Sequence, residues 1–338
     1  MKNPRTRLIV GTIVSLVLLA WVLWRTDWAE VAERLREADL LMLLAAFVLI
    51  AFSVALRAWR WGMMLEPEDA QRPYGTLFDI VNLGYFANNL LPARLGDLLR
   101  AYLAGQWTGA SFSFALSTTV VERVLDTLIV VLMIFGLLPF LPVPPLAARS
   151  GALIGIVFLL GTLLLVVAAW QRASSERLIR LLLRPLPLDA ELWSARLVRL
   201  LDGFALVRQP ARFARVLFAS VFVWGTAISS YWFTFHAFEL AGLGFSSAAF
   251  TVSLAALGMA APSGPASAGT FDAAAAGALV VLGVSSGLAG GIAVILHAIN
   301  FLAVTALGLI TMGRRGVSLS GLTRRAQEVK QLNVGSVE

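Results

Sequence analysis

Two carboxylates and an arginine lie inside an apolar run long enough to cross a membrane, TTVVERVLDTLIVVLMIFGLL (residues 118–138). On a helix Glu122 and Asp126 share one face, and Arg123 lies about 60° from Asp126. Within residues 112–135, fourteen Leu, Ile, Phe and Val residues favour insertion by about 4–8 kcal/mol in total. Three central charges oppose it by about 8–10 kcal/mol. The charges must therefore face protein or water, where Glu122 and Asp126 could hold a cationic group or carry protons.

Partners for these charges are available in the preceding segment, NNLLPARLGDLLRAYLAG (residues 88–105). If a helix follows Pro92, then Arg94, Asp97 and Arg100 fall within one arc of about 120°. Pro92 suits the first position of such a helix, whose free amides, with Arg94, would attract an anion such as phosphate. Asn82, Asn88 and Asn89, at or before the break, can hydrogen-bond the backbone groups that the break frees.

A second broken segment, PSGPASAGTFD (residues 262–272), repeats the spacing of the first. The run from Pro92 to Gly96 and the run from Pro265 to Gly269 both read Pro-Ala-x-x-Gly. Asp272 falls in the first turn of the following helix, where a carboxylate is stabilised. An alternative is that Asp272 reaches toward Arg94 or Arg123. Chance repetition in a chain rich in Ala, Gly and Pro is the alternative to a true repeat.

The elements that must position these groups are membrane helices. The 338-residue chain is 59% hydrophobic and 14% charged, and apolar runs recur along its length, so we predict an all-α polytopic membrane protein. The arginine distribution places both termini in the cytoplasm. On that reading Arg57 and Arg60 end the second span at the cytoplasmic face, with Trp59 and Trp61 as interfacial anchors. Full spans are expected at about 8–24, 40–59, 111–138, 150–171, 214–240 and 287–312.

The two broken segments, about 72–106 and 248–282, are predicted to be re-entrant helical hairpins that enter from opposite sides. With their flanking spans they form inverted repeats, an arrangement that places a binding site near the midplane. We therefore predict one transmembrane domain (1–338), with repeat A at about 40–138 and repeat B at about 214–312. A cytoplasmic amphipathic linker is expected at 172–213, where apolar residues recur at spacings of three and four.

Other chemistries lack support in the sequence. There is no cysteine, and His236 and His297, the only histidines, form no metal-ligand pattern. Ser267 has no nearby base, and no nucleotide-binding loop is present, so we expect no cofactor, no metal and no catalytic residue. The net charge of +7 arises from arginines beside the spans, which favours anionic lipid over nucleic acid as a partner. The charged cluster could also be a salt-bridge network that only holds helices together.

The segments NNLLPARLGDLLRAYLAG, VVERVLD and PSGPASAGTFD resemble the transmembrane region of the lysylphosphatidylglycerol synthase/flippase family. The third departs from the usual Pro-Gly-Gly-x-Gly-x-x-Glu, because Ala266 and Ser267 replace glycines and Asp272 replaces Glu. The resemblance implies a bacterial plasma-membrane protein that moves an anionic or aminoacylated phospholipid between leaflets. It transfers site roles to Asn89, Pro92, Arg94, Gly96, Asp97, Arg100, Glu122, Arg123, Asp126, Pro265, Gly269 and Asp272.

The sequence thus predicts a stand-alone flippase-like transporter. No counterpart of the family's soluble synthase domain is found, so lysyltransferase activity is not expected. Two alternatives remain open: an intramembrane lipid-modifying enzyme using Asp126 or Asp272, and an accessory subunit of a polyprenyl-lipid or glycosyltransferase pathway. A polyprenyl-phosphate lipid is accordingly a further possible partner. The sequence leaves open the lipid's identity, the direction and energy source of transport, and the oligomeric state.

Overall fold

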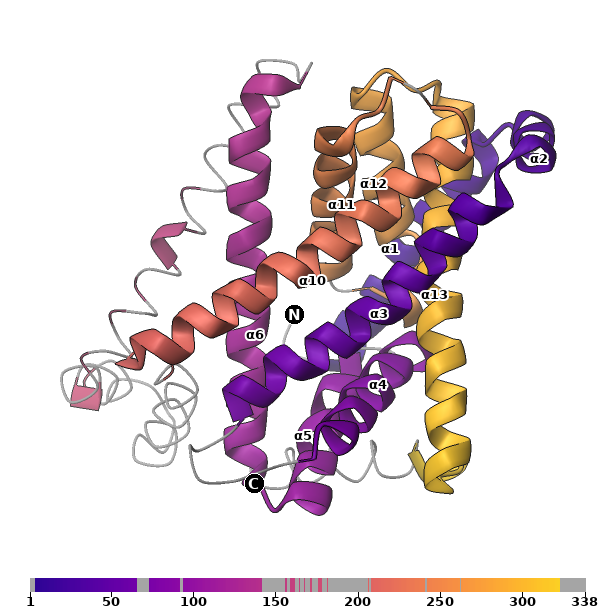
Figure 1. Ribbon diagram of the computed structural model, residues 1–338. Coiled ribbons are helices and arrows are strands. Elements are labelled where there is room, and N and C mark those ends of the chain that lie inside the picture. The colour runs from indigo at the N-terminus through magenta and orange to yellow at the C-terminus, as the bar shows by residue number, and fades with distance from the viewer. Residues whose placement is uncertain are drawn as a thin grey trace.

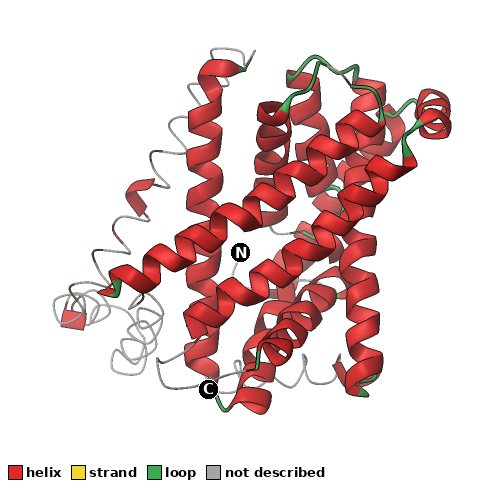
Figure 2. Cartoon of the chain, in the orientation of Figure 1, coloured by secondary structure: helices red, strands yellow, loops and turns green. Residues whose placement is uncertain are grey.

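The computed structural model describes residues 4–65, 73–91, 94–141, 208–240, 242–261 and 263–322, with isolated residues and short runs between 156 and 206. Among these residues every regular element is helical (Figure 2). The helices are α1 (Pro4–Arg25), α2 (Trp28–Glu37), α3 (Leu40–Leu65), α4 (Tyr74–Leu90), α5 (Leu95–Thr108), α6 (Phe112–Leu137), α10 (Pro210–Ala237), α11 (Phe245–Ala260), α12 (Thr270–Val281) and α13 (Ser286–Arg315).

Four of these helices, α3, α6, α10 and α13, are long and apolar enough to cross a membrane. A fifth candidate is formed by α1 and α2, which meet at an angle of 75°. Asp27 sets this bend by capping α2, because its carboxylate accepts hydrogen bonds from the Ala29 and Glu30 amides at 3.1 Å. The all-helical, multi-pass prediction is therefore confirmed. Most of the predicted span at 150–171 and of the linker at 172–213 lies outside the described residues, and the count of six spans stays a prediction.

One predicted boundary is wrong in a way that matters for function. Helix α3 continues to Leu65, past the expected end at residue 59. The extra turns carry Arg60 and Trp61 into the protein, where both side chains are fully buried. Trp61 therefore is not an interfacial anchor. Its indole Nε1 donates to Thr118 Oγ1 of α6 at 3.1 Å, which ties the end of α3 to the start of α6.

The two segments predicted to be broken are each a pair of short helices that fold back on themselves. In the first pair, α4 packs on α5, and Gly96 lies so close to Gly84 that a Cβ at Gly96 would overlap the Gly84 carbonyl oxygen. In the second pair, α11 packs on α12, and a Cβ at Gly258 would overlap the Thr270 carbonyl oxygen. Small residues at these contacts let the two backbones of each pair approach closely.

The same two long helices flank both pairs. Helix α6 packs against α5 and α11, and α13 packs against α4 and α12. Figure 1 shows α4 and α5 in the lower half of the molecule and α11 and α12 in the upper half, with α3 and α10 crossing in front. The breaks of the two pairs meet between them, because the short turn η4 (Pro265–Ser267) contacts α4.

Helix α1 packs against the second break and forms hydrogen bonds with it. The Ser15 hydroxyl donates to the Ala268 carbonyl at 2.5 Å and accepts from the Gly264 amide at 3.2 Å. Gly269 has φ of +85° and sits against the Ser15 carbonyl with no room for a side chain. Glycine is needed there both for the backbone conformation and for the close approach.

Candidate functional site

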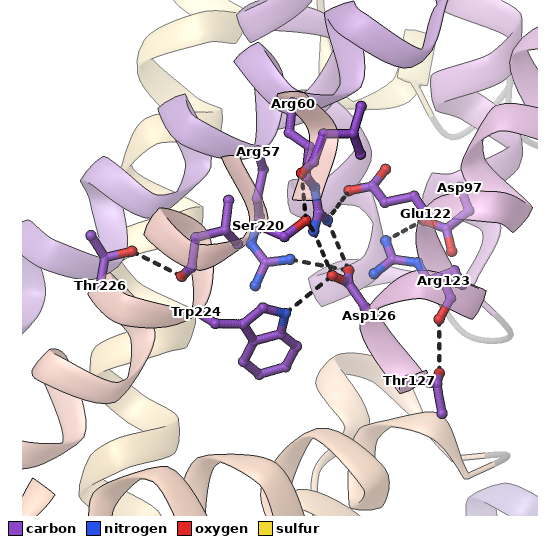
Figure 3. Close-up of polar contacts among 12 residues, drawn as sticks. Arg57, Arg60, Asp97, Glu122, Arg123, Asp126, Thr127, Ser220, Trp224 and Thr226 are labelled. Atoms are coloured by element: carbon purple, nitrogen blue, oxygen red, sulfur yellow. Dashed lines mark hydrogen bonds and ion pairs between the residues drawn. The ribbon is translucent and has the colours of Figure 1, made fainter. Parts of the chain in front are cut away.

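Arg60 of α3 binds the buried carboxylates of α6 (Figure 3). Its guanidinium donates two hydrogen bonds to the Asp126 carboxylate, of 2.6 Å from Nη1 and 2.9 Å from Nη2. Nη2 also donates to Glu122 Oε1 at 2.9 Å, and Nη1 donates to Ser220 Oγ of α10 at 3.1 Å. One arginine on α3 thus binds two carboxylates on α6 and a hydroxyl on α10. A forked, fully buried arrangement of this kind compensates charges that lipid could not accommodate.

Glu122 has a second cation, Arg100 of α5. Arg100 Nη1 lies 2.7 Å from Glu122 Oε2, and the two side chains are 2% and 0% exposed. This is an ion pair by distance, although its atoms are not aligned as a hydrogen bond. The Arg100 guanidinium also lies over the Trp61 ring, 4.0 Å from its centroid. The prediction that the segment after Pro92 supplies partners for α6 is confirmed at this pair.

Asp97 and Arg123 form the second predicted link between α5 and α6. Arg123 Nη2 lies 3.2 Å from Asp97 Oδ1, which also accepts a hydrogen bond of 3.1 Å from the Asn88 amide. Asn88 in turn accepts from the Gly96 amide at 2.9 Å, so this asparagine satisfies a backbone group freed at the break. The guanidinium groups of Arg57 and Arg123 lie near the Tyr85 ring, at 5.8 and 5.6 Å from its centroid.

A cavity of about 390 Å³ opens where the two breaks meet. Among the described residues, its charged lining residues are Arg57, Arg94, Asp97 and Arg123. Apolar side chains cover much of the remainder, among them Val252, Met259, Phe271 and Val304. The site is therefore amphipathic: its charged residues come from α3, the start of α5 and α6, whereas α11 and α12 contribute apolar side chains.

Arg94 and Asn89 connect the first broken helix pair to α11 and α13 at this cavity. The Arg94 guanidinium donates to the carbonyl of Met259 near the end of α11. Arg94 itself has a left-handed backbone (φ of +53°) and stands at the N-cap of α5, so α5 begins at Leu95. Asn89 donates to Thr305 Oγ1 and the Phe301 carbonyl of α13, at 3.3 and 3.4 Å. Pro92, the predicted helix start, lies outside the described residues.

Asp272 does not reach the arginines, and that alternative is wrong. Its carboxylate accepts from the Gly269 amide at 2.8 Å, as expected in the first turn of α12. Its other partner is Nδ1 of His297 on α13, at 3.0 and 3.1 Å from the two carboxylate oxygens. Nε2 of His297 lies 3.2 Å from the Ala266 carbonyl, so the histidine bridges α12 and η4. Asp272 and His297 lie behind the cavity wall formed by Ala266, Ser267 and Phe271.

The predicted residues thus separate into three groups. Asn89, Arg94, Asp97 and Arg123 line the cavity. Arg100, Glu122 and Asp126 are buried beside it and pair with cations or acids of neighbouring helices. Gly96, Pro265, Gly269 and Asp272 shape the two breaks.

The residues of the site that were not predicted include Arg57, Arg60, Tyr85 and His297. The signal for Arg60 was its spacing of three from Arg57, which places both on one face of α3.

Among the charged residues at and beside the cavity, arginines outnumber acids. The set comprises Arg57, Arg60, Arg94, Arg100 and Arg123 against Asp97, Glu122, Asp126 and Asp272. With His297 neutral, this leaves a formal excess of one positive charge within the described residues. Such an excess next to a cavity suits an anionic ligand.

Comparison with known proteins agrees with this membrane architecture. A family model described as the transmembrane region of lysylphosphatidylglycerol synthase matches residues 8–308. A UPF0104 membrane protein of Methanothermobacter thermautotrophicus is 26% identical over 306 residues, 87% of this chain and 89% of its own length. Another, from Pyrococcus horikoshii, is 24% identical over 243 residues, 66% of this chain and 72% of its own. No solved structure matches.

A shorter likeness points to a protein of a different kind. The glycosyltransferase AglD of Haloferax volcanii is 28% identical over 124 residues, which is 37% of this chain and 20% of AglD. These three relatives are archaeal. The predicted bacterial origin and cytoplasmic termini therefore stay predictions, whereas the multi-pass membrane location is supported by the family and by the apolar helices.

Proposed function

The chain belongs to the family of lysylphosphatidylglycerol synthase transmembrane regions, and on this basis we propose that it moves a phospholipid between the leaflets of the plasma membrane. The observation that carries the proposal is the cavity where the two helix pairs meet, which joins a cationic wall to an apolar one. A lipid has the same division between a polar headgroup and acyl chains. The headgroup would occupy the cavity while the acyl chains stay in the bilayer.

In this proposal the helix pairs α4/α5 and α11/α12 are re-entrant hairpins of two inverted repeats. Their lengths support this, because α4, α5, α11 and α12 have 17, 14, 16 and 12 residues, fewer than the roughly 20 that cross a bilayer. Their shared contacts with α6 and α13 also fit repeats related by an axis in the membrane plane. Both termini would lie in the cytoplasm, as the arginine distribution favours.

The charged residues then divide into two roles. Arg57, Arg94 and Arg123 line the cavity and would contact the headgroup. Glu122, Asp126, Arg60 and Arg100 are positioning residues, since their mutual ion pairs hold α3, α5 and α6 in register behind the cavity wall. The expectation that Arg100, Glu122 and Asp126 touch the substrate is replaced here by this indirect role, because none of the three lines the cavity.

The test is a transbilayer assay on the purified full chain in liposomes. Phosphatidylglycerol with a fluorescent acyl chain is incorporated, and dithionite then quenches the label exposed in the outer leaflet. Without transport about half of the fluorescence is protected, and with transport the protected fraction falls toward zero. Protein-free liposomes give the background rate. Quenching no faster than that background, with the protein shown to be folded, would overturn the proposal for this lipid.

A second function is favoured by the likeness to the glycosyltransferase AglD. The chain would then be an accessory membrane subunit that presents a polyprenyl-phosphate lipid to a glycosyltransferase. The same liposomes distinguish the two functions, because an accessory subunit would bind such a lipid without moving any lipid by itself. Chemical conversion of the labelled lipid, detected by chromatography, would instead indicate an enzyme.

A further inference from the structure

We propose that the cavity selects a lipid with a net anionic phosphate headgroup and rejects a lipid whose headgroup carries a net positive charge, such as an aminoacylated phospholipid. This inference rests on the proposed function and narrows its substrate. It starts from the cavity lining, which contains three arginines, Arg57, Arg94 and Arg123, and one acid, Asp97. Arg123 pairs with Asp97, and Arg57 lies 3.6 Å from Asp126 behind the cavity wall. Arg94 is therefore the lining arginine that forms no ion pair among the described residues, and a phosphodiester would neutralise its charge.

The carboxylates near the cavity are already engaged. Asp97 accepts from Arg123 and Asn88, and Asp126 from Arg60 and Trp224. Glu122 is held between Arg60 and Arg100, and Asp272 binds His297. A lysyl ammonium entering the cavity would meet Asp97 as its only carboxylate among the described lining residues, with Arg94 and Arg123 also in that lining. Repulsion between the lysyl ammonium and these guanidinium groups in a partly buried site would oppose binding.

The donor groups of Arg94 point to the same chemistry. Its guanidinium donates to the Met259 carbonyl, which leaves other N–H groups of this cavity-lining arginine available. The Tyr85 hydroxyl and Arg123 Nε are buried rather than exposed to the cavity, and they have no hydrogen-bond partner among the described residues. Phosphate oxygens accept several such bonds at once, whereas an ammonium group accepts none.

Arg94 offers the cleanest test, because its guanidinium donates to a backbone carbonyl rather than to a carboxylate. Arg94→Gln removes one cavity charge without leaving a buried acid unpaired, and Arg94→Lys keeps the charge but loses the planar fork. The matched control is Arg36→Gln on α2, which makes the same charge change at an exposed position away from the cavity.

Transport of acyl-labelled phosphatidylglycerol, lysyl-phosphatidylglycerol and phosphatidylcholine is then compared in the same liposomes. We expect phosphatidylglycerol to move at least about tenfold faster than its lysyl derivative, the difference that about 1.4 kcal/mol produces. Arg94→Gln should slow phosphatidylglycerol by about tenfold, Arg94→Lys should slow it less, and Arg36→Gln should leave it unchanged. Equal or faster movement of the lysyl lipid would overturn the anionic selectivity while the transport function stands.

A binding measurement separates the selectivity from transport itself. Phosphatidylglycerol should raise the Tm of the detergent-solubilised protein more than lysyl-phosphatidylglycerol does. Arg94→Gln should reduce this lipid-dependent rise, and the exposed control Arg36→Gln should leave it unchanged. If phosphatidylglycerol stabilises the protein but no lipid moves, the transport function fails and the anionic site stands. An equal rise with inorganic phosphate would show a free-anion site and overturn the lipid assignment.

Discussion

Arg100 of α5 and Glu122 of α6 form an ion pair of 2.7 Å that is shielded from solvent on both sides. The pair connects the first broken helix pair to the long helix whose charges lipid could not accommodate. Glu122 also forms an ion pair with Arg60 of α3, so this one carboxylate links α3, α5 and α6. Removing one partner of such a buried network leaves a charge without compensation, which is far more costly than removing the whole network.

We therefore expect Glu122→Gln to destabilise the protein by about 3–5 kcal/mol. Equilibrium unfolding in mixed detergent micelles measures this loss. The double variant Glu122→Gln/Arg100→Gln should cost less than the sum of the single changes, because the second change removes the unpaired cation. Glu33→Gln on the exposed face of α2 is the control and should stay within about 0.5 kcal/mol. Equal effects of Glu122→Gln and Glu33→Gln would contradict a structural network at this position.

Gly96→Ala should separate α4 from α5. The added Cβ would overlap the Gly84 carbonyl oxygen and the Asn88 main chain, neither of which can move independently of α4. We expect a loss of about 1–3 kcal/mol in the free energy of unfolding, together with slower lipid movement. Gly75→Ala on the same pair meets no described residue within 4 Å of its new Cβ and should be neutral or slightly stabilising. If the two substitutions behave alike, the close contact at Gly96 does not hold the break together.

His297→Ala should loosen the second break. It removes the partner of the buried Asp272 carboxylate and the contact with the Ala266 carbonyl, at an expected cost of about 1–3 kcal/mol in unfolding free energy. His297→Gln keeps one amide donor and should lose less. His236→Ala provides a control of the same residue type, since His236 is exposed. Thermal unfolding of the three purified variants gives the ranking, and an equal loss for His236→Ala would refute the assigned role.

Ser15→Ala should weaken the contact of α1 with the second break. The hydroxyl makes two hydrogen bonds, to the Ala268 carbonyl and from the Gly264 amide, and losing both should cost about 1–3 kcal/mol. Thermal unfolding of the purified protein would detect the change as a lower Tm. Ser113→Ala, at an exposed position of α6, should leave the Tm unchanged. An equal Tm for the Ser15 variant and the wild type would mean that α1 does not stabilise this segment.

The sequence was most informative where local spacing decides the outcome. Apolar runs predicted α3, α6, α10 and α13, because the length of a span follows from the thickness of the bilayer. The charges of α6 could be recognised as partnered because they cost more than the surrounding residues supply. Arg100 and Asp97 could be named as partners because their spacing places them on one side of α5.

The parts that were missed depend on contacts between distant segments. Arg60 follows an apolar run and lies between Trp59 and Trp61, a pattern typical of a membrane interface. Only the packing of α3 against α6 and α10 shows that it is buried. His297 carries no motif of its own, and its partner Asp272 lies on another helix. A cavity between the two breaks was expected from the paired hairpins, whereas the residues that line it come from segments far apart in the chain, which no local pattern encodes.

The contact between Ser15 and the Gly264–Gly269 turn has a consequence for biogenesis. The two bonded segments are separated by about 250 residues in the chain, with α1 emerging first from the ribosome. At about 5–20 residues per second, α1 waits roughly 13–50 s for its partner to be synthesised. During that interval the Ser15 face of α1 must be covered by lipid, the insertion machinery or another helix. A fusion or truncation at the N-terminus would therefore act on the last stage of assembly, long after the altered residues are made.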